Sequence, residues 1–382
     1  MTQLKEVKIG DILELQRGYD LPIEEMQTGD VIVAGSNGII GYHNIARSNN
    51  PCITVGRSGS VGKVHFYEQP TWAHNTALYV KDFKGNNPVF LYYFLKNLHL
   101  DKLFGKSSSV VPSLDRKIVH AMSVPFIEDK EEQLKIASVL SNIDNKIIQD
   151  REICRNIEAL ASQLFNYWFV QFDFPDTNGN PYKSSGGIME YNTLLKREIP
   201  KGWEVKPLSE IANICRGSII TEAQTVQGDV KVVAAAVSYS YFHNAANRKA
   251  NVITISSSGA NAGYMNFWRE PIFASDCMTI QCESDIDTIL TYYQLRLYRN
   301  GIMQRSHGSA QPHVYPSDIQ SLPFVCVPKE YRDKIENLYI TWNREIANKS
   351  KEIEQLVKQR DALLPVLMNG QVSVRDVKYN KQ

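Results

Sequence analysis

The sequence predicts an α+β protein: two similar mixed α/β domains separated by a long antiparallel two-helix coiled coil, with a pseudo-twofold internal repeat. Three observations predict this class. The chain of 382 residues repeats itself, each half begins with β-rich runs, and each half ends in a long heptad pattern. At about 150 residues per domain, the length accommodates two such domains and their helices.

Nearly the whole chain repeats at an offset of about 199 residues. The segment IGDILELQRG (9–18) aligns with LSEIANICRG (208–217), and both segments end in Arg-Gly. Gly29-Asp30 matches Gly228-Asp229, and Tyr92-Tyr93 matches Tyr292-Tyr293. A period this long is not that of a solenoid, in which the repeats are much shorter. We interpret it as one duplicated module.

The first part of each module carries short β-rich runs that are broken by Gly, Asn and Ser. They are VIVAGSNGIIGYHN (31–44), CITVGRSG (52–59) and TALYV (76–80), then DVKVVAAAV (229–237) and VITISSSG (252–259). One helical stretch interrupts them in each half, over 88–104 and over 287–302. We therefore predict mixed α/β domains over residues 1–130 and 199–329.

The last part of each module is a long helix with a heptad pattern, predicted over 131–175 and within 330–382. The a positions are 136, 143, 150, 157 and 164, the d positions are 140, 147, 154, 161 and 168, and a shift of 199 gives the second helix. Apart from Asp150, Lys349 and Arg360 these positions are apolar, which is typical of a coiled-coil seam. Pro365 predicts a kinked or frayed last turn.

Asp150 and Lys349 occupy the same position of the repeat, near the middle of their helices. If the helices pair antiparallel, these side chains meet at the crossing. We predict a semi-buried ion pair that fixes the register with little net gain in stability; a solvated pair at a frayed seam is the alternative. Residues 176–198 are predicted to be a linker, because the segment around them is rich in Pro, Gly, Ser and Asn.

No catalytic or cofactor motif stands out. GRSGSVGK (56–63) lacks the first Gly and the final Ser or Thr of a phosphate-binding loop. Cys277, Cys282 and His307 lack the spacing and the fourth ligand of a structural zinc site, so no metal is expected. The six cysteines form no CxxC pair, and we expect reduced thiols in a cytoplasmic protein. No signal pattern or membrane-length apolar run is present, so no membrane is expected.

The net charge of +1 excludes a purely electrostatic, histone-like binder of nucleic acid, but not local basic surfaces. Basic residues in stretches poor in acids are candidates for phosphate contacts: Arg57, Lys63, Lys106, Arg248, Lys249 and Arg305. Polar residues between them are candidates for base contacts: Ser58, Ser60, His74, Asn75, Ser107, Ser108, Ser257, Ser258, Asn261, His307, Ser309 and Gln311. The alternative is that these loops are only turns between strands.

The chain resembles the specificity subunit of a Type I restriction-modification system over nearly all of its length. The most specific segments are LFNYWFVQFDFP (164–175) and LLPVLMNGQVSV (363–374), which are similar to the ends of the family's two conserved regions. IPKGWEVKPLSEI (199–211) resembles the opening of the second target-recognition domain. SVPFI (123–127) and SLPFVCVP (321–328) are similar to the strand that leads into each helix.

The resemblance implies two target-recognition domains that each read half of a split sequence in double-stranded DNA, while the coiled coil sets the spacing. It implies a subunit without an enzymatic site or cofactor. Two methyltransferase subunits, which bind S-adenosylmethionine, and two restriction/translocase subunits would assemble with it. Shortening both helices by one turn is expected to shorten the recognised spacer. The alternatives are an assembly scaffold that does not bind DNA and a duplicated transferase enzyme.

Overall fold

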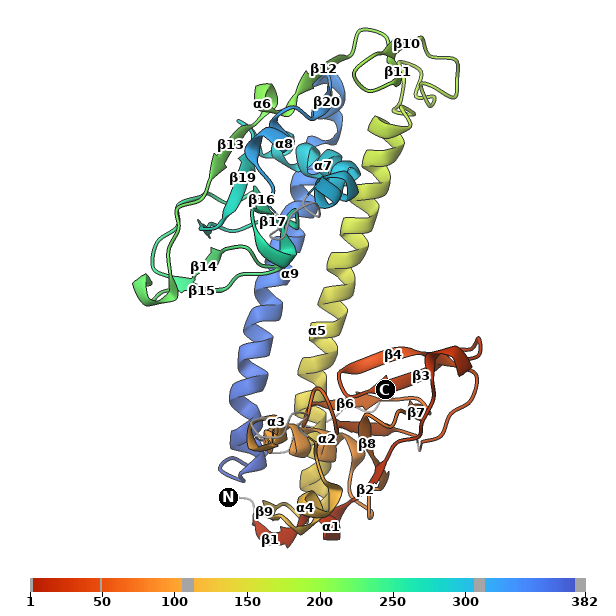
Figure 1. The fold of residues 1–382 in the computed structure, drawn as a ribbon, viewed down its shortest axis with the longest axis vertical. Helices are drawn as coiled ribbons and strands as arrows, with labels where there is room; N and C mark the ends of the chain where they lie inside the picture. Colours follow the sequence, from red (N-terminus) through yellow and green to blue (C-terminus); the bar gives the residue numbers. More distant parts are fainter. Residues whose placement is uncertain (1–2, 49, 105–112, 306–312, 375–382) are drawn as a thin grey trace. The chain divides into compact units, whose positions relative to one another are not determined.

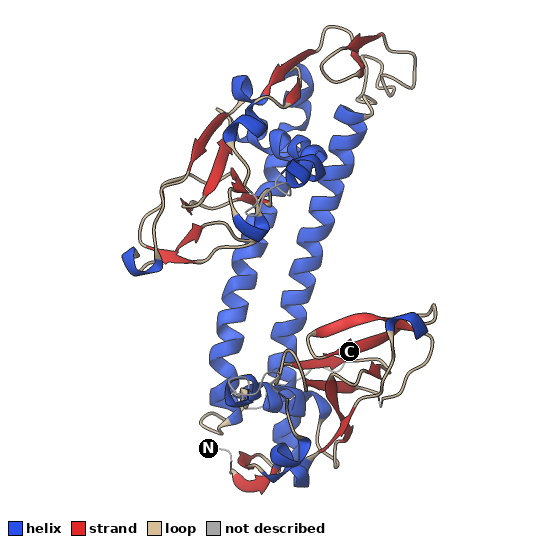
Figure 2. Ribbon diagram, viewed as in Figure 1, coloured by secondary structure: helices blue, strands red, loops and turns tan. Residues whose placement is uncertain are grey.

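The computed structural model describes residues 3–48, 50–104, 113–305 and 313–374, and it shows helices and small sheets (Figures 1 and 2). The chain divides into two compact units. The first unit comprises residues 1–149 with 353–382, and the second comprises 150–352. Each unit therefore contains one mixed domain and one end of each long helix. Within the described ranges, none of the helices combines the length and the apolar composition of a membrane span.

The first domain contains a four-stranded sheet of order β2-β8-β5-β6, a three-stranded sheet of order β4-β3-β7, and the pair β1-β9 (Figure 1). Its strands are β1 Lys5–Lys8, β2 Glu14–Arg17, β3 Val31–Gly35, β4 Gly38–His43, β5 Cys52–Gly56, β6 Val64–Tyr67, β7 Trp72–Ala73, β8 Ala77–Asp82 and β9 Ser123–Phe126. Its helices are α1 Ile9–Ile12, η1 Ile23–Glu25, α2 Pro88–Asn97, α3 Leu100–Phe104 and α4 Arg116–Ala121.

The second unit has the same strand orders, β13-β19-β16-β17, β15-β14-β18 and β12-β20, with the additional hairpin β10-β11. Its strands are β10 Met189–Asn192, β11 Arg197–Pro200, β12 Glu204–Pro207, β13 Asn213–Arg216, β14 Val230–Val233, β15 Tyr241–His243, β16 Val252–Ser256, β17 Met265–Trp268, β18 Phe273–Ala274, β19 Cys277–Gln281 and β20 Pro323–Cys326. Its shorter helices are α6 Leu208–Ile211, η3 Glu222–Gln224, η4 Gly259–Asn261, α7 Asp285–Arg305 and α8 Pro316–Gln320. The sequence repeat thus corresponds to a repeat of strand topology.

The helix predicted over 88–104 is two helices. Asn87 caps α2 by accepting a hydrogen bond from Phe90 N, and Pro88 occupies its first turn, where a missing N–H costs little. The break before α3 falls at His99, whose φ of 49° lies in the left-handed region. In the second unit the corresponding stretch is the continuous helix α7.

The long helices are α5, Lys130–Phe165, and α9, Lys329–Met368. α5 is shorter than the predicted 131–175, because the backbone continues as a π-helical turn, η2 Asn166–Val170, and Phe172 has a φ of 66°. An aromatic cluster follows, in which Phe174 stacks on Trp203 at 5.0 Å. Burial of these rings within the second unit explains why the chain leaves the helix here.

The segment predicted as a linker, 176–198, is structured in large part. Tyr182 stacks on Phe174 with ring centroids 4.8 Å apart, and Met189–Asn192 pairs antiparallel with Arg197–Pro200. Pro and Gly in this stretch make turns within a packed segment rather than a free connection, because Tyr182, Met189 and Leu195 pack against the core of the second unit.

Within each unit α5 and α9 contact each other antiparallel. In the first unit Ile136 and Leu140 share a core with Leu364 and Leu367, and Asp144 pairs with Arg360. In the second unit Lys349 Nζ lies 3.1 Å from Asp150 Oδ1, and the Tyr339 hydroxyl donates to Ala161 O at 2.7 Å.

All heptad positions of α5 are buried or half-buried, as the pattern predicts. In α9 the pattern is wrong at its last a position, because Leu363 is 38% exposed and Leu364 is buried instead. A helix of 3.6 residues per turn drifts from a repeat of seven, so the buried face moves by one residue near its end. α9 continues through Pro365 to Met368.

Candidate nucleic-acid interface

Four connecting segments meet at one end of the first domain. We call this surface loop cluster 1 and define it as residues 36–37, 57–63, 74–76 and 113–116. They connect β3 to β4, β5 to β6 and β7 to β8, and lead into α4. Because each segment begins or ends at a sheet or helix, the fold fixes their relative positions.

Main-chain hydrogen bonds hold the loops of cluster 1 together. The N–H groups of Arg57 and Ser58 both donate to Thr76 O, at 2.9 and 3.1 Å. Leu114 N donates to Arg57 O at 2.8 Å, and Ser58 forms an isolated β-bridge with Ser113. Arg57 is therefore held through both its N–H and its carbonyl group.

Side chains of cluster 1 are held by neighbouring loops. Arg57 Nη1 donates to Asn75 O at 3.3 Å, and Lys63 Nζ donates to Asn37 Oδ1 at 2.7 Å. The Asn75 amide donates to the carboxylate of Asp20. The structure thus brings together three residues that the sequence predicts as a DNA-binding set, and it adds Asn37, for which the sequence carries no signal.

Two further predicted residues of the first domain, His74 and Ser60, also lie in cluster 1. His74 Nδ1 is 2.9 Å from Thr76 Oγ1, and burial lowers the pKa of the imidazole below its ordinary value. The ring is therefore neutral at pH 7, with one donor and one acceptor nitrogen. Gly62 has a φ of 78° and packs against the backbone of α3, where a side chain would collide.

The second domain has an equivalent surface, loop cluster 2, which we define as residues 234–235, 257–263, 275–276 and 313–315. Val314 N donates to Ser257 O at 3.0 Å, and Ser258 forms a β-bridge with His313. These contacts repeat those of Arg57 and Ser58 in cluster 1, so Ser257 is the structural counterpart of Arg57.

The side chains of cluster 2 differ from those of cluster 1. Ser258 Oγ donates to Asp276 Oδ2 at 2.6 Å, and Asn261 Nδ2 lies 3.5 Å from Ala235 O. Asp276 occupies the place of Asn75. The predicted residues Ser257, Ser258 and Asn261 therefore come together on the same backbone framework, with different chemistry.

Arg248 and Lys249 are not brought to cluster 2. Arg248 donates from Nε to Thr279 Oγ1 at 2.8 Å and from Nη2 to Arg216 O at 2.9 Å, and a third bond goes to Asn247 O. Those contacts tie the Arg248 side chain to β13 and β19 of the sheet. Lys249 is exposed before the start of β16, whereas cluster 2 follows the end of that strand.

Several predicted residues lie outside the described residues: Lys106, Ser107, Ser108, His307, Ser309 and Gln311. Arg305 ends α7, and its side chain is likewise outside the described part.

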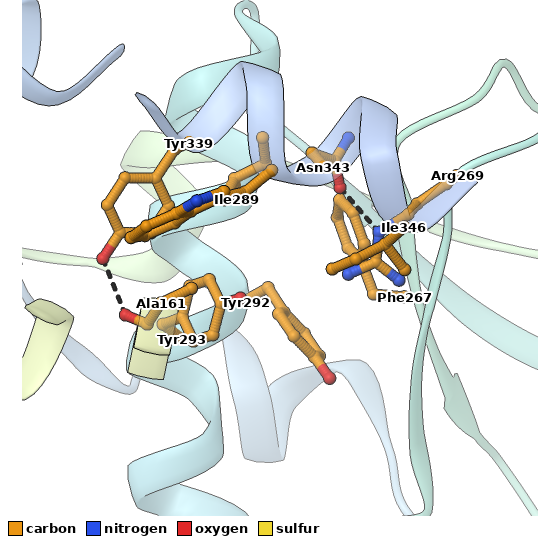
Figure 3. A pocket seen from close by; sticks show the side chains of 10 residues that line it. Ala161, Phe267, Arg269, Ile289, Tyr292, Tyr293, Tyr339, Asn343 and Ile346 are labelled. Atoms are coloured by element: carbon orange, nitrogen blue, oxygen red, sulfur yellow. Dashed lines mark hydrogen bonds between the residues drawn. The ribbon is translucent and has the colours of Figure 1, made fainter. Parts of the chain in front are cut away.

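Residues 231–269 contain no Asp or Glu, but two basic residues of this stretch have acidic partners elsewhere in the chain. Lys231 pairs with Glu270 at 2.5 Å. Arg269 pairs with Glu158 of α5 and donates to Asn343 Oδ1 of α9 at 2.7 Å, beside the bond from the Tyr339 hydroxyl to α5 (Figure 3). Lys231 and Arg269 therefore anchor parts of the second unit to one another.

The described residues hold no group of three or more His, Cys, Asp or Glu side chains that could bind a metal ion. Cys277 is buried, and burial raises the pKa of its thiol to about 12. Cys282 Sγ lies 3.3 Å from Thr291 Oγ1, and burial raises the pKa of that thiol as well. Both are protonated packing residues at neutral pH.

Comparison with known proteins agrees with the duplicated fold. Residues 1–159 and 200–355 match the family described as the Type I restriction modification DNA specificity domain. The specificity subunit of the Type I restriction enzyme MjaIX of Methanocaldococcus jannaschii is 26% identical over 311 residues, covering 75% of this chain and 70% of that protein. The specificity subunit of the enzyme HindI of Haemophilus influenzae is 33% identical over 90 residues, covering 22% of this chain and 19% of that protein.

A solved structure has the same fold. The crystal structure of the S subunit of a Type I restriction-modification system from M. genitalium superposes with a TM-score of 0.64 at 18% identity, covering 96% of both chains. Loop cluster 1 lies within the first family match and loop cluster 2 within the second.

Proposed function

This chain belongs to the family of Type I restriction-modification DNA specificity subunits, and on that premise we propose that it selects the DNA target of such a complex. Each mixed domain reads one half of a bipartite site through its loop cluster. The observation that carries the proposal is the pair of clusters, which share a backbone framework and differ in side chains. Two similar frameworks with different donors and acceptors suit the reading of two different half-sites.

The two long helices would act as the spacer between the half-sites. Their antiparallel contacts within each unit, and a seam that contains the Asp150–Lys349 pair, support a coiled coil of fixed register. Half-site centres about one helical turn apart, roughly 34 Å, would let both domains meet the same face of the duplex.

Chemistry would reside in the partners. Methylation of adenine requires a base flipped out of the duplex and an enzyme that holds it. We propose that this subunit docks two methyltransferase subunits, which bind S-adenosylmethionine, and through them two restriction/translocase subunits. A scaffold that binds no DNA is the alternative, and it predicts no salt-dependent affinity of the assembled complex for DNA.

Mapping of N6-methyladenine across a genome tests the function. Cells that express this chain with its methyltransferase partner should carry methylation at one bipartite motif, and deletion of the chain alone should abolish it. Methylation at an undivided motif, or methylation that persists after the deletion, would contradict the proposal.

Replacing Lys63 by alanine should weaken the binding of the assembled complex to every DNA sequence, because the exposed ammonium would contact phosphate rather than bases. The slope of log affinity against log salt should fall by about one unit. Titration of DNA at several salt concentrations measures both effects.

Arg269→Met is the matched control, since it also removes one positive charge. Because Arg269 is held by Glu158 and Asn343, its loss should leave the salt slope unchanged and lower the free energy of unfolding by about 2 kcal/mol. Equal salt slopes for the Lys63 variant and the unmodified protein would contradict a phosphate contact at Lys63.

A further inference from the structure

An open hollow of about 910 Å³ lies beside loop cluster 1, along strands β2 and β8 and next to the end of β5. Its basic residues are Arg17, Arg57, Lys81 and Arg116. Its acidic residues are Glu14, Asp20 and Asp115. Gln16 and Tyr19 add neutral polar groups to the lining. Charges of both signs are therefore concentrated in one concave surface of the first domain.

This balance of charge favours a base edge over a phosphate as the occupant. Lys81 pairs with Glu14 at 3.2 Å, and Arg17 lies 3.7 Å from Asp20. The remaining carboxylate, that of Asp115, accepts a hydrogen bond from Lys117 N at 2.8 Å. Two of the four cations are thus paired with carboxylates, which weakens their attraction for a phosphate, whereas a base edge carries neutral donors and acceptors and needs no excess of positive charge.

Among the described residues, Arg57 has no acidic side chain within ion-pair distance. Hydrogen bonds hold both its main-chain N–H and its carbonyl group. Within the described part of the chain, its side chain makes one hydrogen bond, from Nη1 to Asn75 O. That bond orients the guanidinium group. Because a guanidinium has five N–H donors, others stay available for a ligand. A guanidinium that is oriented in advance loses little freedom when it forms a bidentate contact.

The equivalent place in the second domain has no such group. Ser257 occupies the place of Arg57. The carbonyl oxygen of Arg57 accepts a hydrogen bond from Leu114 N, and that of Ser257 accepts one from Val314 N; each donor directly follows a β-bridged residue. Gln281 follows Ile280 as Lys81 follows Val80, the residue that matches Ile280 in the sheet, so Gln281 replaces Lys81. Tyr315 replaces Asp115 as the residue at the N-cap of the following helix. Arg216 occupies the place of Arg17, since Arg17 pairs with Leu78 and Arg216 pairs with Met278. It is the one position of the hollow's charged set that is also charged in the second domain. The two domains therefore offer different chemistry on one framework.

We propose that Arg57 determines specificity by making a bidentate contact to a guanine, through its N7 and O6 atoms, in the half-site that the first domain reads. This inference rests on the proposed function and deepens it. Guanine presents two acceptors side by side in the major groove, which match the two parallel N–H groups of a guanidinium. Serine at position 257 has a single hydroxyl and cannot make this contact, so the second half-site is read differently.

The test compares methylation motifs of the chain assembled with its methyltransferase partner. Arg57→Lys keeps the positive charge but loses the paired N–H geometry, and Arg57→Ala removes both. In each variant one guanine position of one half-site should become degenerate, and the other half-site should stay unchanged. In competition binding, the preference for guanine at that position should fall about 5- to 150-fold. Ser257→Ala is the matched control and should leave that position unchanged.

Three results would overturn the assignment to Arg57. One is an unchanged motif in both Arg57 variants, with thermal unfolding and assembly intact. Another is a loss of affinity at all sequences together with a smaller salt slope, which identifies a phosphate contact. The third is an unmodified protein whose half-sites contain no guanine. If the unmodified complex methylates no bipartite motif at all, the proposed function fails first, and the two failures are thereby distinguished.

Discussion

Replacing Lys349 by leucine is expected to lower the free energy of unfolding by about 3 to 5 kcal/mol. The mutation removes the ammonium group that lies 3.1 Å from Asp150 Oδ1, and the Asp150 side chain has no exposed surface. A carboxylate that stays buried after the loss of its cation is costly, because it cannot recover its hydration. Urea unfolding followed by circular dichroism measures the change.

The double variant Asp150→Leu/Lys349→Leu measures the contribution of the ion pair as a whole, without leaving an unpaired buried charge. Because both charges leave together, its stability should return to that of the unmodified protein or exceed it. Cysteine pairs across the seam should then cross-link in more than one register, because the polar pair no longer selects one.

Arg155→Leu, on α5 with Asp150, is the control. Arg155 lies 3.5 Å from Glu152 with most of its side chain exposed, so its loss should change stability by less than about 1 kcal/mol. The burial argument fails if Lys349→Leu and Arg155→Leu have equal effects. A double variant that cross-links in one register only would instead contradict the role of the pair in fixing the register.

Lengthening both long helices by one heptad is expected to lengthen the spacer of the methylated motif by about 3 base pairs. Copies of residues 143–149 and 350–356 would be inserted after Gln149 and after Lys349 respectively, which keeps the heptad phase and removes no contact. Seven residues add about 10.5 Å at 1.5 Å per residue, and each base-pair step spans about 3.4 Å. Mapping of N6-methyladenine gives the new motif.

An insertion into α5 alone is the control for this experiment. It shifts one part of α5 by seven residues relative to α9. The ion pairs Asp150–Lys349 and Asp144–Arg360 therefore cannot both form. We expect it to abolish methylation rather than move it. The spacer role of the helices is wrong if the double insertion methylates the original motif with its original spacing.

Regular patterns in the sequence predict much of this fold because they reflect local geometry. Runs such as Cys52–Gly56 form fully buried strands, and the heptad pattern identifies the buried face of α5. The pattern is wrong at Leu363, where small drifts accumulate toward the end of a long helix. Similarly, composition marks 176–198 as a linker, but the contact between Tyr182 and Phe174 depends on tertiary packing.

The binding surface is harder to predict, because charge along the chain does not show which charges meet in space. Arg269 looks free in a stretch without acids, but its partner Glu158 is 111 residues away. Arg248 bonds to Thr279, 31 residues along the chain. Arg57, Ser58 and Asn75 lie close together because they flank β5 and β8, which pair with each other. The hollow with Arg17 and Arg116 combines the ends of distant elements, so no local signal indicates it.

The division of the chain into units has a consequence for the order of folding during synthesis. The second unit is one continuous stretch, 150–352, whereas the first needs residues 353–382 in addition to 1–149. Leu364 and Leu367 complete the core around Ile136 and Leu140, and Val374 N donates to Glu132 at 3.3 Å. On the ribosome the second unit can therefore finish first, although its sequence emerges later. The part of the apolar face of α5 that Leu364 and Leu367 cover stays exposed until the last turns of α9 are made, which is the interval in which a chaperone would bind.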